Sequence, residues 1–387
     1  MPPPKRTAAI ILAAGFSSRM GAFKPLMDVG GTTVLDRVVN LYTQAGVSDI
    51  RVVVGHGRED IRSALAGRSA VLVPNPDFAD GMYSSVVAGI QSLPENIGTF
   101  FIHPVDIALV RPHTIRTLMA ALHNHPTRVV SPEFDRHRGH PPLIHKDALP
   151  AIRNHDGRGG LRAVLNRLAP ETRRVPVADQ GILLDLDTPE DARALTARLK
   201  QSYFLTPAEC RVLLENVLQV EATVVNHCRK VADVARALAK AVEQNGVVID
   251  TGLTYASARV HDLAKGRPDH AAVGAALLRQ MDFPAMAGIV AAHMNIAVSD
   301  HAPLDESQIV YLADKLVAGT AIVGLTRQFD AKLKHVGHDP DIAARIRERR
   351  RAALEIGNKV VRASGRSLAD IVQHASAVSE NNPCIPS

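Results

Sequence analysis

A loop rich in small and basic residues follows the first apolar run of the sequence. The segment LAAGFSSRMGAFKPLM spans residues 12–27 and contains Gly15, Arg19 and Lys24. Small residues let backbone N–H groups approach an anion closely, and arginine and lysine side chains bind phosphate oxygens. The pattern is neither a P-loop nor the dinucleotide-binding G-x-G-x-x-G. It predicts a phosphate-binding loop, although an ordinary turn can have the same composition.

Two aspartates that follow other apolar runs are candidate metal ligands. Asp106 is the first acid after TFFIHP, and Asp187 lies in LLDLDTPED. Mg²⁺ is typically held by one or two carboxylates together with phosphate oxygens, so we expect Asp106 to bind it. Asp187 has two interpretations: a second ligand of the same ion, or the cap of a helix that DTPED begins.

A second set of metal-binding residue types lies in the C-terminal half. His261 and Asp262 are adjacent at the end of an apolar helical pattern. The other members of this set are His227, His270, His293 and Asp314. Imidazole and carboxylate groups from several facing helices are how helical bundles build metal sites. One such residue alone would be more typical of a cap or an exposed position, but the ordered set beside apolar neighbours predicts a metal site.

Short β-rich runs alternate with amphipathic helical patterns up to about residue 200. The runs are TAAIILA, DIRVVVG, AVLVP, TFFIHP, RVVSP, PPLI and GILLDL. Strands separated by helices imply βαβ units, and therefore a largely parallel sheet with helices on both faces. We predict an α/β domain over residues 1–200. Such a sheet binds ligands at the C-terminal ends of its strands, where the loop at residues 12–27 and Asp106 both fall.

The pattern changes after residue 200. Thr206-Pro207-Ala208-Glu209 combines a threonine cap, a proline at the first helical position and a glutamate three residues after the cap, which together indicate a helix start. Nearly every later segment has helical periodicity, so we predict an all-α domain over residues 201–387. The basic run Arg345–Arg351 is interpreted as a solvated helix face rather than a nucleic-acid contact.

Composition narrows the class of protein. With 387 residues the chain exceeds one ordinary core, which favours two domains. Lys and Arg number 45 against 39 Asp and Glu, a mild excess that suits an enzyme for anionic small molecules. Aromatic residues make up 4% with no Trp, which argues against base-stacking platforms. No run is long enough to span a membrane, and three scattered cysteines fit a reducing cytoplasm. We expect no membrane or nucleic-acid partner.

The loop at residues 12–27 resembles that of the MobA-like nucleotidyltransferases, especially the molybdenum cofactor cytidylyltransferase branch. The family pattern LAAG-x-S-x-R-M-G-x-x-K is matched throughout residues 12–24. Further likenesses extend over about the first 200 residues, in DGMYSSVVAGI, HPVDIALV, RGHPPLI, DGRGGLRAVL and DLDTPED. The resemblance implies a three-layer, Rossmann-like α/β fold, and LAAG rather than LAGG favours CTP over GTP. Ala108 stands where the family usually has proline, and His103 is unusual on its strand, so the acceptor stays open.

That resemblance implies roles for particular residues. Those expected to contact the base and ribose are Leu12, Ala13, Ala14, Gly15, Ser84 and Ser85. Arg19 and Lys24 would hold the triphosphate, and Asp106 would bind Mg²⁺. The expected reaction transfers CMP from CTP to the terminal phosphate of a molybdopterin-type cofactor and releases pyrophosphate. Such transfers need positioning and charge neutralisation more than covalent chemistry.

Other acceptors and partners are consistent with the same loop. Sugar- or alcohol-phosphate cytidylyltransferases carry similar loops, although they generally have glycine where Ser17 stands. A role in handing a finished cofactor to a molybdoenzyme apo-protein is a further alternative that the sequence does not separate from catalysis.

The helical set resembles the HD-domain metal-dependent phosphohydrolases over residues 221–318. The resemblance implies the ligands His227, His261, Asp262 and Asp314, with His270 and His293 for a second ion. A bound divalent transition metal would lower the pKa of its water towards about 7 and hold phosphate oxygens for hydrolysis of a phosphoester. Lys265 would either contact the substrate phosphate or extend along the surface. The alternative is a regulatory domain that senses nucleotide or metal.

Overall fold

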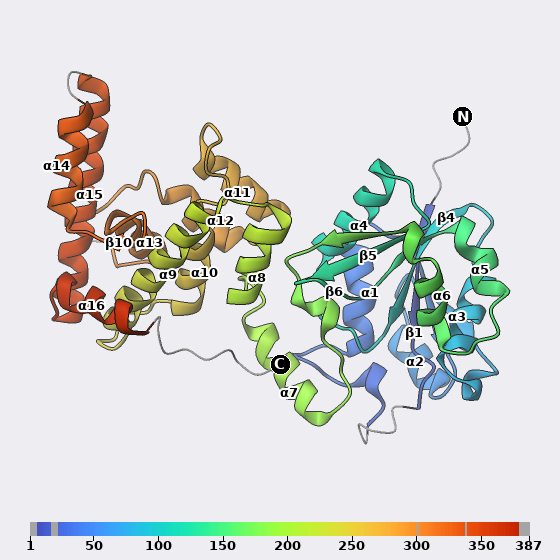
Figure 1. Ribbon diagram of the computed structural model, residues 1–387. Coiled ribbons are helices and arrows are strands. Elements are labelled where there is room, and N and C mark those ends of the chain that lie inside the picture. Colours follow the sequence, from blue (N-terminus) through green and yellow to red (C-terminus); the bar gives the residue numbers. More distant parts are fainter. Residues whose placement is uncertain (1–5, 17–21, 300–301, 337–338, 379–387) are drawn as a thin grey trace. The chain divides into compact units, whose positions relative to one another are not determined.

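The computed structural model divides the chain into two compact units, Met1–Lys200 and Gln201–Ser387 (Figure 1). The structure describes residues 6–16, 22–299, 302–336 and 339–378. Within those ranges, no helix combines the length and the apolarity needed to cross a membrane.

A mixed sheet of eight strands forms the centre of the first unit. Its spatial order is β3 (Val71–Pro74), β2 (Asp49–Val54), β1 (Arg6–Leu12), β4 (Ile97–Pro104), β7 (Leu143–His145), β5 (Val129–Phe134) and β6 (His137–Arg138), with β8 (Thr172–Pro176) also paired to β5. Strands β1 to β4 are parallel, whereas β7 is antiparallel to both of its neighbours. The predicted α/β class is confirmed, but the sheet is less uniformly parallel than expected.

Helices cover both faces of this sheet. The helices of this unit are α1 (Val34–Gln44), α2 (Arg58–Ala64), α3 (Met82–Gln91), α4 (Pro112–Asn124), α5 (Leu149–Arg153), α6 (Gly160–Arg167) and α7 (Pro189–Lys200). Because side chains alternate along a strand, Ile10 and Ile102 pack in one core with α3, α5 and α6. On the opposite face Phe101 contacts Tyr42 of α1. A Cβ at Gly89 of α3 would collide with Ile10, so glycine there lets α3 lie close to the sheet.

The segment GILLDL at residues 181–186 is not the strand that its apolar residues predict. Gln180–Leu183 form a 3₁₀ helix, and the strand of this region is β8. Asp179 fixes the turn, because its carboxylate accepts hydrogen bonds from the backbone N–H of Gly181 (3.0 Å) and from Thr114 Oγ1 (2.6 Å). A short buried run does not by itself separate a strand from another buried segment.

The second unit is a helical bundle. Its helices are α8 (Pro207–Val212), α9 (Ala222–Glu243), α10 (Thr251–Val260), α11 (His270–Gln280), α12 (Pro284–Ala292), α13 (Glu306–Lys315), α14 (Leu325–Val336), α15 (Pro340–Ser364) and α16 (Leu368–Val378). The capping box predicted at Thr206 and Glu209 is present at the start of α8. Over the described residues the only strands of this unit are β9 (Val317–Ala318) and β10 (Ala321–Ile322), so the predicted all-α class is confirmed.

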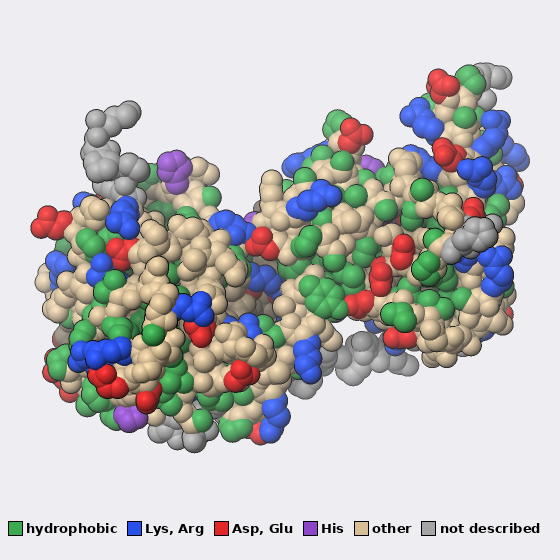
Figure 2. All heavy atoms as spheres, turned by 180° about the vertical axis from the view of Figure 1, so that it is seen from behind, with side chains coloured by type: hydrophobic (Ala, Val, Ile, Leu, Met, Phe, Trp, Pro, Cys, Tyr) green, Lys and Arg blue, Asp and Glu red, His purple; other side chains and the backbone are tan. Residues whose placement is uncertain are grey.

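Basic side chains lie on the outer face of α15. Arg345, Arg347 and Arg351 are exposed, and Figure 2 shows Lys and Arg side chains gathered along the α14–α15 hairpin, at its upper right. The opposite face of α15 buries Ile346 and Ile356. Arg345, Arg347 and Arg351 therefore lie on the solvent-facing side of an amphipathic helix, whereas Arg349 and Arg350 are partly buried and bond Asn295 and Asp330.

Two candidate functional sites

A cleft lies at the C-terminal ends of the central strands of the first unit. It consists of two cavities of about 310 and 1000 Å³ that share Leu12, Met82, Pro104 and Asp106 in their walls. The smaller cavity is lined by the segment 12–16 and by Lys24. Asp106 therefore lies where the two cavities meet, at the strand-end position expected for a ligand site of such a sheet.

Lys24 and the neighbouring aspartates form the charged centre of this cleft. Lys24 Nζ lies 2.5 Å from Asp187 Oδ1 and 3.6 Å from Asp106 Oδ2. Burial raises the pKa of Asp106; the charge of Lys24 opposes this shift and that of Asp187 adds to it. Burial, together with Asp106 and Asp187, also raises the pKa of Asp185. These carboxylates therefore destabilise one another's charge, an arrangement that a bound cation relieves.

The structure separates the two interpretations of Asp187. Thr188 Oγ1, not Asp187, accepts a hydrogen bond from the backbone N–H of Asp191 at the start of α7 (3.2 Å). Asp191 Oδ2 in turn accepts from the backbone N–H of Thr188 (2.7 Å). The cap interpretation of Asp187 is wrong, because its carboxylate contacts Lys24. Its role as a Mg²⁺ ligand stays a prediction.

The two predicted serines lie in the first turn of α3. Ser85 is buried and lines the smaller cavity, whereas Ser84 is absent from the walls described for both cavities. Asn75 Nδ2 donates hydrogen bonds to Ser84 Oγ (2.8 Å) and Ser85 Oγ (3.0 Å). Asn75 is 4% exposed and follows β3 directly. Sequence analysis missed this amide, although a polar residue immediately after a strand was a usable indication.

Two aromatic rings line the smaller cavity, and the sequence analysis did not predict them. Phe16 and Phe78 both line it, with ring centroids 5.2 Å apart. Phe16 is 56% exposed, and an exposed ring at a cavity wall suits stacking against a nucleobase. Arg19 and Ser17, which the sequence also assigned to this loop, lie outside the described residues.

His103 is a buried histidine whose ring bonds the backbone of Ile107, next to Asp106. It is 0% exposed; its Nε2–H donates to the carbonyl of Ile107 (2.8 Å), and its Nδ1 accepts from the hydroxyl of Tyr42 (2.9 Å). Burial lowers the pKa of His103 to about 3, so the ring is neutral. Ala108 is buried as well. Both departures from the family pattern are therefore part of the packing that supports the Asp106 turn.

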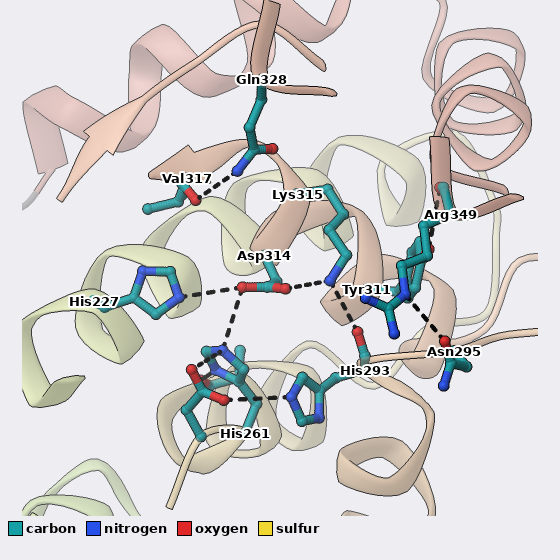
Figure 3. Close-up of polar contacts among 12 residues, drawn as sticks. His227, His261, His293, Asn295, Tyr311, Asp314, Lys315, Val317, Gln328 and Arg349 are labelled. Carbon is teal, nitrogen blue, oxygen red and sulfur yellow. Dashed lines mark hydrogen bonds and ion pairs between the residues drawn. The ribbon is translucent and has the colours of Figure 1, made fainter. Parts of the chain in front are cut away.

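The helical unit brings the six predicted histidines and aspartates together, and Figure 3 labels His227, His261, His293 and Asp314 among them. Two groups have all their ligand atoms within 4.8 Å of one another: His227, His261 and Asp262, and Asp262, His270 and His293. Asp314 Oδ1 lies 3.2 Å from His227 Nε2 and 3.4 Å from His261 Nε2. Helices α9 and α13, the ends of α10 and α12, and the start of α11 supply these residues.

Backbone carbonyls orient three of the imidazole rings. The Nδ1 atoms of His227, His261 and His293 lie 2.9, 2.8 and 2.6 Å from the carbonyl oxygens of Gly319, Ala258 and Val290, respectively. A carbonyl only accepts, so each Nδ1 carries a proton, and in the neutral ring Nε2 is left with a lone pair. In metal-binding histidines, such a bond at the nitrogen that does not hold the metal fixes the tautomer.

The lone pairs of these rings face carboxylate oxygens. His261 Nε2 lies 3.4 Å from Asp314 Oδ1, and His293 Nε2 lies 3.4 Å from Asp262 Oδ1. At such distances a neutral ring and a carboxylate repel each other unless a proton or a metal cation lies between them. Moreover, His261 Nε2 and Asp262 Oδ1 are buried without a hydrogen-bond partner, which is rare in native proteins. Imidazole and carboxylate donors suit a divalent transition metal, so the residues present fit such an ion.

Two lysines contact the outer carboxylate oxygens. Lys315 Nζ donates to Asp314 Oδ2 (2.5 Å) and to the carbonyl of His293 (3.1 Å), and its side chain is buried. Lys265 Nζ donates to Asp262 Oδ2 (2.9 Å) from a half-exposed position. Burial alone would raise the pKa of Asp314, but Lys315 and His227 lower it well below its ordinary value, so this carboxylate is ionised. Sequence analysis missed Lys315, although it directly follows Asp314.

Each of the two units contains a match to a known domain family. Residues 9–172 match the MobA-like NTP transferase domain, and residues 224–319 match the HD domain. The chain therefore carries a nucleotidyltransferase domain of the MobA-like family, followed by an HD domain.

Among relatives, the chain is similar to the molybdenum cofactor cytidylyltransferase of Escherichia coli, with 28% identity over 183 residues that cover 47% of this chain and 91% of that protein. The bifunctional IPC transferase and DIPP synthase of Rubrobacter xylanophilus is 37% identical over 117 residues, 29% of this chain and 26% of the relative. The 2-aminoethylphosphonate cytidylyltransferase of Lancefieldella rimae is 35% identical over 117 residues, 28% of this chain and 46% of that protein. The chain thus spans about a quarter of the Rubrobacter protein and under half of the Lancefieldella protein.

Proposed function

We propose that the first unit transfers CMP from CTP to a phosphate-bearing acceptor, with a molybdopterin-type cofactor as the favoured acceptor. The observation that carries this proposal is the position of Asp106, at the junction of two cavities and beside Lys24 and Asp187. One cavity would hold the nucleotide and the other the acceptor. The similarity to a molybdenum cofactor cytidylyltransferase supports this choice.

The chemistry follows from that arrangement. A phosphate oxygen of the acceptor attacks the α-phosphorus of CTP, and the bond to the β-phosphate breaks, so pyrophosphate leaves. Lys24 neutralises negative charge on the triphosphate, while Ser85 and the residues 12–15 orient the nucleoside. Asp106 and Asp187 are the residues that would hold Mg²⁺, which when bound neutralises charge on the phosphate oxygens.

The second unit is proposed to be a metal-dependent phosphohydrolase. Its support is the pair of buried, unpartnered atoms, His261 Nε2 and Asp262 Oδ1, among the other ligands. When bound, a divalent ion would lower the pKa of its water and hold phosphate oxygens. Lys265, half-exposed beside Asp262, would bind the substrate phosphate. A cytoplasmic location and delivery of the product to a molybdoenzyme apo-protein are further parts of the proposal that rest on sequence alone.

Pyrophosphate release tests the first activity. The full chain is incubated with Mg²⁺ and CTP, GTP or ATP, each with molybdopterin cofactor, a sugar phosphate or 2-aminoethylphosphonate. We expect release with CTP and the molybdopterin cofactor, and a loss of at least about 100-fold in Asp106→Asn. Asp60→Asn, a change at an exposed position of α2, is the matched control. Release with GTP and not CTP, or full activity in Asp106→Asn, would contradict the proposal.

Hydrolysis of bis(p-nitrophenyl) phosphate with added Mn²⁺ tests the second activity. Asp262→Asn should abolish it while nucleotidyl transfer is retained. If the wild-type chain binds metal at its histidines but hydrolyses no phosphoester of a broad panel, the regulatory alternative replaces the phosphohydrolase.

A further inference from the structure

Four arginines line the larger cavity. They are Arg136, Arg138, Arg162 and Arg174, hereafter the arginine group. They come from the turn after β5, from β6, from α6 and from β8. The same cavity reaches Asp106, so the group belongs to the part of the cleft proposed to hold the acceptor.

The charges of the arginine group are poorly compensated within the protein. Arg174 Nη1 lies 3.3 Å from Glu133 Oε2. For the other three, no hydrogen bond or ion pair joins the guanidinium to any residue that the structure describes. Burial, followed by the charges of Arg174 and Arg162, lowers the pKa of Arg138. Other arginines of this unit are paired, as Arg111 is with Asp179 (3.4 Å). Arg136, Arg162 and Arg174 are exposed, so water solvates most of this charge, and an anion that entered the cavity would replace that water.

The backbone at Arg136 is a second, independent observation. Asp135 and Arg136 form the two-residue turn between β5 and β6, with φ values of 49° and 68°. Such turns favour glycine at the second position because both residues have positive φ, and a non-glycine residue there carries a conformational cost. Arginine stands at position 136 against this local preference, and its side chain lines the cavity. No hydrogen bond or ion pair of the Arg136 side chain with a described residue offsets this cost.

We propose that the arginine group binds a second anionic group of the acceptor, separate from the phosphate that reacts beside Asp106. This inference rests on the proposed nucleotidyl transfer and specifies its substrate class: the acceptor is a polyanion. Guanidinium groups bind phosphate and carboxylate oxygens in a bidentate manner. A zwitterion such as 2-aminoethylphosphonate would bring an ammonium group towards the arginines, and a monophosphate with a neutral body would leave them uncompensated.

Calorimetric titration of the full chain tests this proposal. Mg²⁺ and a non-hydrolysable CTP analogue fill the nucleotide site, and the probes are fructose 1,6-bisphosphate, fructose 6-phosphate and 2-aminoethylphosphonate. We expect the bisphosphate to bind at least about tenfold more tightly than the monophosphate, a difference that two charge-assisted bonds can supply, and 2-aminoethylphosphonate to bind most weakly. Arg138→Gln and Arg162→Gln should bring the ratio of the two sugar phosphates close to one. Arg62→Gln, at an exposed position of α2, should keep it.

Arg136→Gly separates binding from folding. Glycine suits the turn better than arginine, so this variant should melt at or above the wild-type temperature and still lose the preference for the bisphosphate. Equal affinity of the wild type for both sugar phosphates, or an unchanged ratio in all three variants, would overturn the proposal. Failure of the CTP analogue to bind, read in its own titration, would instead overturn the nucleotidyltransferase proposal, and the probes would then be titrated without it.

Discussion

Two histidines with 0% exposure, His103 in the first unit and His261 in the second, have opposite surroundings. Both ring nitrogens of His103 are bonded, one to the Tyr42 hydroxyl and one to the Ile107 carbonyl. His261 bonds the Ala258 carbonyl through Nδ1, while its Nε2 has no hydrogen-bond partner and lies near two aspartates. Burial alone therefore does not distinguish a structural histidine from a ligand; the state of the second nitrogen does.

The largest effect is expected for a substitution of His261, which should weaken metal binding. His261→Ala removes a lone pair that two carboxylates cannot replace, so the affinity for a divalent transition metal should fall by at least about 100-fold, more than the loss of an outer-sphere partner causes. Metal content of the purified chain is measured by mass spectrometry. His103→Gln is the control, and the chain with this substitution should keep the wild-type metal content. Wild-type metal content in His261→Ala would contradict the assignment.

Lys315→Met should have the next largest effect. It removes the cation that fixes Asp314 Oδ2 and links it to the His293 carbonyl, so metal affinity should fall by about 10–100-fold. Lys359→Met is a matched control, because Lys359 is also buried in this unit but bonds the carbonyls of Ser299 and Ala302. Equal metal affinity in the two variants would remove Lys315 from the site.

The pH dependence of stability tests whether His103 is a neutral structural histidine. The pKa of His103 is about 3 in the folded chain, below the ordinary value of about 6.5 in the unfolded chain. The unfolded state therefore takes up a proton as the pH falls through about 6.5, while the folded state does not. Between pH 7 and pH 5 this group should remove about 2 kcal/mol from the free energy of unfolding of the first unit.

Denaturant titrations of the wild type and His103→Gln at both pH values measure that contribution. Glutamine does not titrate in this range, so the variant should lose less stability than the wild type on acidification. Parallel pH profiles for the two chains would mean that His103 is not a neutral core residue.

The smallest expected effect lies outside both sites. Thr206→Ala removes the side-chain bond to the backbone N–H of Glu209 (3.1 Å) at the start of α8, which should lower the free energy of unfolding of the helical unit by about 1 kcal/mol. Denaturant titration measures this loss. Metal affinity should not change, so a metal-binding defect in this variant would mean that the site depends on the whole bundle rather than on its own ligands.

The fold classes could be predicted because periodicity and caps are local properties. Apolar runs identified β1 and β4, and the capping box identified α8. GILLDL was mistaken for a strand because a buried 3₁₀ turn uses the same apolar residues. The cap interpretation of Asp187 failed because Thr188 competes for the same position, and a sequence does not show which of two adjacent oxygens a helix start will use.

Parts of both sites could not be found in this way because they depend on contacts between distant segments. Lys315 follows Asp314 in sequence, but its link to His293 requires α12 and α13 to meet. The arginine group is distributed over separate elements. Asn75 was a partial exception, since it directly follows β3, but its serine partners lie on α3. The residue types in the sequence indicated where a site is possible, whereas the tertiary packing determines which other residues contact that site.

Asp262 belongs to both groups of metal-binding residues, and this sharing makes the two groups thermodynamically linked. A cation bound by His227 and His261 attracts the same carboxylate that His270 and His293 would use, and it repels a second cation. Each ion therefore changes the affinity for the other by the same factor. A metal titration of this chain should resolve two unequal steps, and the weaker step would report the metal concentration at which the second ion is gained or lost.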